Sequence, residues 1–185
     1  CFLGDGAVVQ GAVHESLNLA SLWNLPCIYV IENNQWGMGT SVSRAVCIEP
    51  IAENMAKGYG IQSYTVDGTN FFDCYALFEE VVRETCKTGR PVLIEAVTER
   101  FRGHSISDPG LYRTKEEVAC AMEEKDPITL LKNALIKEGM LTEEEFHELD
   151  KEQKEIVVAA MKFADESPWP DPMTLEEGVF APEDK

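Results

Sequence analysis

The chain has 185 residues, of which 44% are hydrophobic, and this composition suffices for one domain with a buried core. Its formal net charge of −17 argues against nucleic acid as a partner, because a polyanion would be repelled. No run of about 18 apolar residues occurs, so we expect neither a membrane-spanning segment nor a membrane partner. The sequence opens without an initiator Met or a signal region, and we expect an upstream part that precedes it.

Short apolar runs alternate with helical patterns over the first hundred residues. Strands are predicted at residues 1–3, 27–31, 61–66 and 92–97. After the first strand, Leu17, Ala20 and Trp23 have the spacing of one helix face. Leu19 and Leu22 lie on a second side of the same helix, which is therefore predicted to be buried on two faces.

The segments between the later strands are predicted from turn signals and helical spacing. A loop is predicted at 33–48, a short helix at 51–57 and a turn at 67–70. The apolar spacing from Cys74 to Val82 then indicates an amphipathic helix that ends at Gly89. Residues 100–113 form a polar loop rich in Arg, Gly, Ser and Asp.

The remainder of the chain is predicted to be helical. Thr114 and Thr142 are each followed three residues later by Glu, as in a capping box, and Asp126 precedes a Pro that suits the first helical position. The tail is predicted to be an extended strap because it contains four prolines, Pro168, Pro170, Pro172 and Pro182.

This order of elements predicts the α/β class, with a doubly wound, mainly parallel sheet. We expect residues 1–113 to form part of the α/β domain. Residues 114–185 would form a helical C-terminal extension and Pro-rich tail of the same domain. The net charge is −5 over 1–113 and −12 over 114–185, which indicates a solvated helical surface in the second part. The six cysteines show no Cys-x-x-Cys spacing, and we expect them to be buried free thiols.

Three polar segments follow predicted strands. Gly4-Asp5-Gly6 follows the first strand, Asn33-Asn34 the second, and the 100–113 loop the last. In a parallel sheet the carboxyl ends of the strands meet at one edge, where ligands bind. We therefore expect these segments to converge on one site.

The first two segments have the chemistry of a divalent metal site. Asp5 lies at the predicted start of a helix, where backbone N–H groups attract an anion. The Asp5 carboxylate would repel that anion unless a cation lay between them. Mg²⁺ prefers oxygen ligands and binds with few carboxylates plus phosphates. The Asn34 side chain and a backbone carbonyl near Trp36 are further oxygen donors. Each motif alone is weak, but 26 residues separate Gly6 from Asn33 on consecutive strands, and this pairing is specific.

This spacing resembles the thiamine diphosphate motif, and a longer pattern narrows the resemblance. The segments 4–11, 23–26, 32–40 and 100–113 are similar to those of the alpha subunits of 2-oxoacid dehydrogenase first components, over residues 1 to about 165. The resemblance implies a thiamine diphosphate-binding fold that carries the diphosphate-binding domain.

The resemblance also implies roles for individual residues. Asp5, the Asn34 side chain and the Trp36 carbonyl would bind Mg²⁺ between the cofactor phosphates. In addition, Gly6 and Ala7 would contact the diphosphate through their backbone. Asp5 and Asn34 are thereby also cofactor-binding.

Two residues of the last loop complete the implied site. Arg100 would pair with a phosphate oxygen through its guanidinium fork. His104 would bind beside the reactive carbon of the cofactor and act as the catalytic residue that orients substrate or transfers protons.

The implied activity is thiamine diphosphate- and Mg²⁺-dependent oxidative decarboxylation of a 2-oxoacid with acyl transfer to a lipoyl group. The segment from Gly103 to Pro109 favours pyruvate over branched-chain substrates, and acetoin is the nearest alternative. The implied partners are a beta subunit, in an α2β2 heterotetramer, and a lipoyl-bearing acyltransferase component. The other hypotheses are a single-chain thiamine enzyme and a catalytically inert assembly subunit.

The loop also bears on the source of the chain. Ser105 matches one regulatory serine of mitochondrial family members, but Leu111 directly precedes Tyr112, so the second has no counterpart. We therefore expect a cytoplasmic bacterial protein, with a plastid or the mitochondrial matrix as alternatives.

Overall fold

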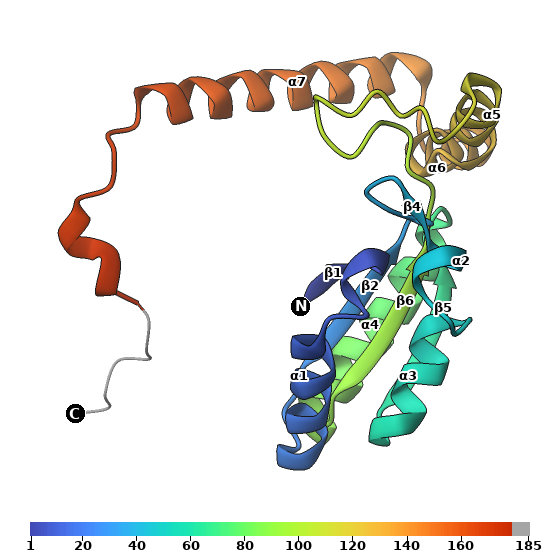
Figure 1. Ribbon diagram of the computed structural model, residues 1–185. Helices are drawn as coiled ribbons and strands as arrows, with labels where there is room; N and C mark the ends of the chain where they lie inside the picture. Colours follow the sequence, from blue (N-terminus) through green and yellow to red (C-terminus); the bar gives the residue numbers. More distant parts are fainter. Residues whose placement is uncertain (179–185) are drawn as a thin grey trace. The chain divides into compact units, whose positions relative to one another are not determined.

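The computed structural model describes residues 1–178. They form two compact units, one from Cys1 to Leu135 and the other from Ile136 onwards. The first unit contains a sheet of four parallel strands in the order β1-β2-β6-β5 (Figure 1). The strands are β1 (Phe2–Gly4), β2 (Ile28–Asn33), β5 (Gln62–Asp67) and β6 (Val92–Val97). All four predicted strands and their parallel arrangement are confirmed.

Helices cover both faces of this sheet. α1 (Gly11–Trp23) and α3 (Ile51–Tyr59) pack on one face, and α4 (Phe71–Thr88) packs on the other (Figure 1). The chain moves in one direction from β1 through β2 to β5 and then returns to β6. Right-handed crossovers place the returning helix on the opposite face. The sheet is therefore doubly wound, as predicted.

The core alternates with the strand period of two. Ile31 and Leu93 are fully buried against α1 and α3, whereas Val92 and Ile94 are buried against α4. Central strand β6 has neighbours on both sides and helices on both faces, which accounts for its run of four buried residues from Val92 to Glu95.

The predicted burial of α1 on two faces is wrong. Leu17 and Ala20 are buried against the sheet, but Leu22 and Trp23 are 67% and 61% exposed. The helix packs on the sheet through one stripe, and its outer side is left uncovered by the other described elements of the first unit. Asn24 in the left-handed conformation ends the helix.

The segment predicted as a loop at 33–48 contains short regular elements. A two-stranded antiparallel hairpin, β3 (Trp36–Gly37) and β4 (Thr40–Ser41), precedes the one-turn helix α2 (Val42–Ala45). These elements have two to four residues each and are too short to produce a periodic pattern. The expectation of a loop is corrected accordingly.

Helices α3, α4 and α5 are present as predicted, although α3 continues past residue 57 to Tyr59 and α4 begins at Phe71, before the predicted Cys74. Their ends follow capping residues. Gly60 and Gly89 are left-handed and end α3 and α4, and Asn70 caps the start of α4. The Thr114 capping box is present at the start of α5 (Lys115–Lys125). α6 (Pro127–Lys137) begins at the predicted proline.

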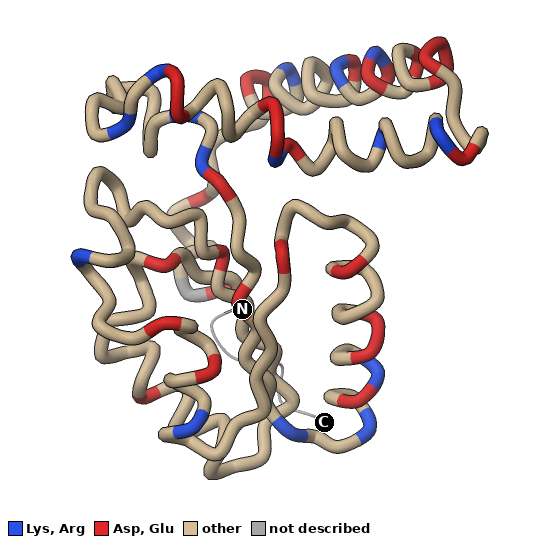
Figure 2. The backbone as a smooth tube through the Cα atoms, turned by 90° about the vertical axis from the view of Figure 1, so that its right-hand side faces the viewer, with Lys and Arg blue, Asp and Glu red and all other residues tan. Residues whose placement is uncertain are grey.

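The second unit contains one long helix and the start of the tail. α7 (Glu143–Glu166) begins at the predicted Thr142 capping box and has no buried residue. Figure 2 shows acidic and basic residues interspersed along it, and several form pairs four residues apart. The extended-strap prediction is wrong for the segment Pro172–Glu176, where Asp171 caps a 3₁₀ turn, and Pro182 lies outside the described residues. The predicted division at residue 113 stays a prediction.

The cysteines are free, as predicted, but they are not buried. Cys27 and Cys74 are half-buried, and the other four are exposed. Apolar neighbours in the sequence did not ensure burial: Cys1 and Cys47 lie outside regular elements, and Cys86 and Cys120 lie on exposed faces of α4 and α5. Across residues 1–178, no helix combines the length and apolarity required to cross a membrane.

Candidate functional site

The carboxyl ends of three strands lie level at one edge of the sheet. Gly4 pairs with Glu32, and Asn33 pairs with Val97. The 3₁₀ turn Asp5–Ala7 after β1 therefore begins beside the segment that follows β2. Both segments lie at the edge from which the 100–113 loop leaves β6. The predicted convergence of the three segments is confirmed for their starting points.

The turn after β1 and the hairpin after β2 approach through two glycines. A Cβ atom on Gly6 would lie 3.0 Å from Gly37 Cα, and a Cβ atom on Gly37 would lie 3.0 Å from Gly6 Cα. Contacts this close to backbone disfavour a side chain at either position, because the facing backbone would have to shift. Glycine at both positions therefore allows the Asp5 turn and the hairpin to pack together.

Asp5 is a buried carboxylate with an unsatisfied oxygen. The residue is 1% exposed, and its Oδ2 has no hydrogen-bond partner. Burial raises the pKa of the Asp5 carboxyl, and nearby backbone N–H groups and the charge of Arg100 offset part of this effect. A buried, unsatisfied carboxylate oxygen is costly unless a cation binds it. The side chain thus fits the role of a metal ligand.

Asn34 and Trp36 supply neutral oxygens next to Asp5. The half-buried Asn34 accepts a hydrogen bond through Oδ1 from the Trp36 backbone N–H at 3.2 Å, and its own backbone N–H lies near the Asp5 carboxyl. The Trp36 carbonyl accepts a hydrogen bond from Arg100 Nη2. Amide and carbonyl oxygens have two lone pairs each, so both retain capacity for a further partner.

The donor set at this corner is the oxygen set that Mg²⁺ prefers. Residues 1–178 contain no cluster of three or more His, Cys, Asp or Glu suited to a metal. The predicted set includes only one such residue, Asp5, and takes its other protein ligands from an amide and a carbonyl. Phosphate and water oxygens usually complete magnesium sites of this kind. The residues present fit the ion.

Arg100 joins the hairpin to the last loop. Its Nη1 donates to the Met38 carbonyl at 2.7 Å and lies 3.5 Å from Tyr112 Oη, while Nη2 donates to the Trp36 carbonyl. The guanidinium therefore lies at the same corner as the Asp5 carboxylate, which it influences electrostatically. Its charge suits a phosphate oxygen, and this contact stays a prediction.

The 100–113 loop is organised around one carboxylate. Asp108 accepts hydrogen bonds from the His104 backbone N–H (2.7 Å), the Gly110 backbone N–H (2.9 Å) and Tyr112 Oη (2.9 Å). These donors lower the pKa of the Asp108 carboxyl. Gly103 is required beside it, because a Cβ atom there would lie 2.4 Å from the Asp108 carbonyl oxygen.

His104 lies on the exposed part of this loop. Its backbone is fixed by Asp108, but its side chain is exposed. Among the described residues, no hydrogen bond joins its imidazole to Asp5 or Asn34. The structure thus brings Asp5, Asn34, Trp36 and Arg100 together, with Gly6 and Ala7 in the adjoining turn, and leaves His104 outside this group.

Comparison with known proteins decides the family. The family model described as "Dehydrogenase E1 component" matches residues 1–173. The chain belongs to the dehydrogenase E1 component family. The resemblance seen in the sequence is confirmed at this level.

Several relatives of this E1 family chain are pyruvate dehydrogenase E1 component alpha subunits. The protein of Rhizobium meliloti (strain 1021) is 45% identical over 180 residues, which cover 97% of this chain and 51% of the relative. That of Rickettsia felis is 39% identical over 179 residues, covering 97% and 54%. The somatic mitochondrial form of Bos taurus is 40% identical over 169 residues, covering 90% and 42%. The chain thus spans about half the length of the curated relatives it matches.

The group Asp5, Asn34, Trp36 and Arg100 is called the metal corner, as the candidate site for the ion. A buried polar network next to it in this E1 chain was not predicted from the sequence. Asn33 Nδ2 donates to Glu95 Oε1 at 2.7 Å, and the Ala52 backbone N–H donates to Glu95 Oε2 at 3.0 Å. Glu95 is 2% exposed although it carries an ionisable group. A glutamate within the otherwise apolar strand 92–97 is the signal that could have identified it.

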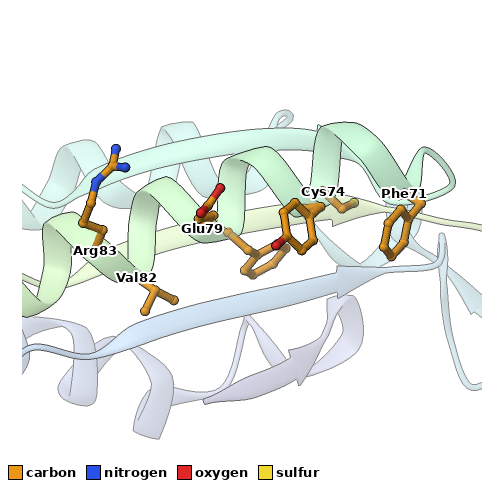
Figure 3. A pocket seen from close by; sticks show the side chains of 7 residues that line it. Phe71, Cys74, Glu79, Val82 and Arg83 are labelled. Carbon is orange, nitrogen blue, oxygen red and sulfur yellow. The ribbon is translucent and has the colours of Figure 1, made fainter.

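An open apolar depression lies elsewhere on the first unit. Figure 3 shows that its lining side chains come from α4. The lining residues are Phe71, Cys74, Tyr75, Phe78, Glu79, Val82 and Arg83. It contains none of the predicted site residues, and we assign it no chemistry.

Proposed function

We propose that this chain is part of the alpha subunit of a pyruvate dehydrogenase E1 component. The protein would catalyse oxidative decarboxylation of pyruvate with acetyl transfer to a lipoyl group. The observation that carries the proposal is the buried Asp5 carboxylate, whose Oδ2 lacks a partner beside the oxygens of Asn34 and Trp36. Pyruvate as substrate is supported by the relatives, which bear this name at 37–45% identity.

The metal corner would hold Mg²⁺ and the diphosphate. Asp5, the Asn34 side chain and the Trp36 carbonyl would bind the ion, and Gly6 and Ala7 would direct backbone N–H groups at the phosphates. Thiamine diphosphate held at this corner would supply a carbanion and an electron sink for decarboxylation of the 2-oxoacid.

Arg100 would neutralise phosphate charge at this corner. It contacts the Trp36 and Met38 carbonyls, which hold its guanidinium at the hairpin. A preorganised cation loses little side-chain entropy on binding an anion. Arg100 would thereby link the metal corner to the loop that carries His104.

His104 would act on the substrate side of the cofactor. Its imidazole would hold or transfer a proton at a ring nitrogen, or orient the substrate oxo group. The loop presents the exposed side chain while Asp108 fixes its backbone N–H.

The proposed assembly is an α2β2 heterotetramer that acts with a lipoyl-bearing acyltransferase component. The relatives are named as alpha subunits of a component, which supports a complex. They come from bacteria and from mitochondria. We infer a bacterial cytoplasmic protein, with the mitochondrial matrix or a plastid as the alternatives.

The test uses the full-length alpha subunit assembled with its beta partner. Turnover of pyruvate, of acetoin and of branched-chain 2-oxoacids is measured with and without thiamine diphosphate and Mg²⁺. We expect cofactor-dependent turnover of pyruvate, lost in His104→Ala and retained in the control His147→Ala, which alters an exposed histidine of α7.

Each other result selects one alternative. Turnover of acetoin or of a branched-chain substrate alone would keep the metal corner and change the substrate. A complex that assembles but has no cofactor-dependent activity on any of the three would favour the inert assembly subunit and overturn the proposal.

A further inference from the structure

We propose that Glu95 is a positioning residue, which fixes the metal-binding segment 34–36 through Asn33. The inference rests on the proposed function, because it assumes that Asn34 and the Trp36 carbonyl hold Mg²⁺. Glu95 lies on β6 and does not itself belong to the predicted ligand set.

Glu95 is itself held in place by a helix. Its Oε2 accepts the backbone N–H of Ala52, in the first turn of α3, whose N-cap Pro50 makes no side-chain capping bond. The first N–H groups of a helix need acceptors and favour a negative charge. The carboxylate of Glu95 satisfies one of them from a different element and is thereby held in one orientation.

Asn33 is held in turn by Glu95. Glu95 Oε1 accepts Asn33 Nδ2 at 2.7 Å, and the Asn33 carbonyl accepts the Thr98 backbone N–H at 2.8 Å. Because the amide nitrogen donates to Glu95, the amide oxygen must face the opposite way. The orientation of the Asn33 side chain therefore depends on the carboxylate.

The turn around Asn34 is held by the Asn33 side chain. Asn33 Oδ1 accepts both the backbone N–H of Gln35 (3.1 Å) and its Nε2 (3.0 Å). Gln35 has a φ of 70°, a left-handed conformation that is unfavourable for a residue with a side chain. Two hydrogen bonds to one fixed oxygen stabilise this conformation. The turn directs Asn34 and the following hairpin towards Asp5.

A purely apolar residue at position 95 would leave Asn33 Nδ2 and the Ala52 N–H buried without partners, so the network stabilises the fold as well. The positioning role predicts more than stability. It predicts that metal affinity depends on which atom of residue 95 faces Asn33.

The experiment compares substitutions at both ends of this bond in the full-length alpha subunit assembled with its beta partner. Mg²⁺ is titrated at a fixed, saturating concentration of thiamine diphosphate, and the dissociation constant is obtained by calorimetry. In Glu95→Gln one acceptor becomes a donor, and we expect affinity for Mg²⁺ to fall about 10-fold or more, as for other residues that orient metal ligands. Asn33→Asp places two carboxylates together and is expected to weaken binding similarly.

The double variant Asn33→Asp with Glu95→Gln is the decisive comparison. It keeps the total charge and reverses the hydrogen bond, so that the residue 95 amide donates to the residue 33 carboxylate. Recovery of affinity towards the wild-type value is expected. The control Ile94→Val alters a buried neighbour that faces α4, and it is expected to lower thermal stability without changing affinity for Mg²⁺.

Gln35→Ala provides a variant that leaves the core intact. It removes one of the two bonds to Asn33 Oδ1 and is expected to weaken Mg²⁺ binding in the same direction, even if Glu95→Gln fails to assemble. Unchanged affinity in Gln35→Ala, or in an assembled Glu95→Gln, overturns the positioning role alone. A wild-type complex that binds neither Mg²⁺ nor thiamine diphosphate overturns the proposed function together with this inference.

Discussion

The metal corner follows β1 and β2, and the 100–113 loop follows β6 at the same edge of the sheet. The two regions are held in place in different ways. Asp5 and Glu95 are buried, and the segments around them are fixed by parallel strand pairing and by the contact between Gly6 and Gly37. The loop has no regular structure and depends mainly on hydrogen bonds to Asp108. Folding of the sheet therefore positions Asp5 and Asn34, whereas the shape of the loop, which carries Arg100, depends on a few polar contacts at the surface.

The largest effect is expected from Asp5→Asn. The substitution keeps the shape of the side chain and removes the negative charge from the metal corner. Affinity for Mg²⁺ in the presence of thiamine diphosphate should fall by more than about 100-fold, beyond the range for residues that only orient ligands. Calorimetry on the assembled complex measures it. Asp165→Asn, on exposed α7, is the matched control, and an equal affinity in both variants would contradict the role of Asp5.

Gly6→Ala tests whether the corner depends on the contact between backbones. The added Cβ atom would meet Gly37 Cα at 3.0 Å, so stability should fall by about 1–3 kcal/mol. Gly11→Ala is the control, because a Cβ atom there meets nothing within 4 Å and Ala favours the helix by up to about 1 kcal/mol. Urea unfolding of the two variants should shift in opposite directions; a shared direction would count against a tight corner.

Asp108→Asn addresses the loop. Asn retains one acceptor oxygen, but its amide nitrogen cannot accept the bonds from the His104 N–H and Tyr112 Oη. Backbone hydrogen exchange should accelerate over residues 100–113 and remain unchanged in β2 and β6. Tyr112→Phe removes only one of these bonds and should have a smaller effect. Faster exchange throughout the sheet would show that the two regions are not independent.

The smallest effect concerns pH. Hydrogen bonds lower the pKa of Asp108 in the folded protein below the ordinary value of 3.8. A carboxyl with a lowered pKa stabilises the loop above its ordinary pKa, and this contribution is lost as the pH falls through the lowered value. Exchange in the loop, corrected for intrinsic rates, should therefore stay constant from about pH 7 to pH 5. A rise within that range would mean that another group controls the loop.

The sequence predicted the sheet well because each buried strand has a clear apolar run, and β6 lies where residues 92–97 were expected. It also placed Asp5 and Asn34 at one edge, since parallel strands determine where their ends lie. It did not predict exposure of Leu22 and Trp23, because an apolar stripe shows that a face can be buried but not whether a partner element covers it. The hydrogen bonds of Glu95 were not predicted, because they join three elements that are distant in the sequence.

The central position of β6 also governs the order in which the protein can fold during synthesis. Residues 1–67 include three of the four strands of this sheet, yet only β1 and β2 are neighbours among them, and within residues 1–178 the partner strand of β5 is β6. β5 therefore has no strand partner in this sheet until residues 92–97 have left the ribosome. Asn33 likewise meets its carboxylate acceptor only then, because Glu95 lies 62 positions downstream. Closing such distant pairs is slow, so the metal corner would be completed late, after much of the surrounding chain has been made.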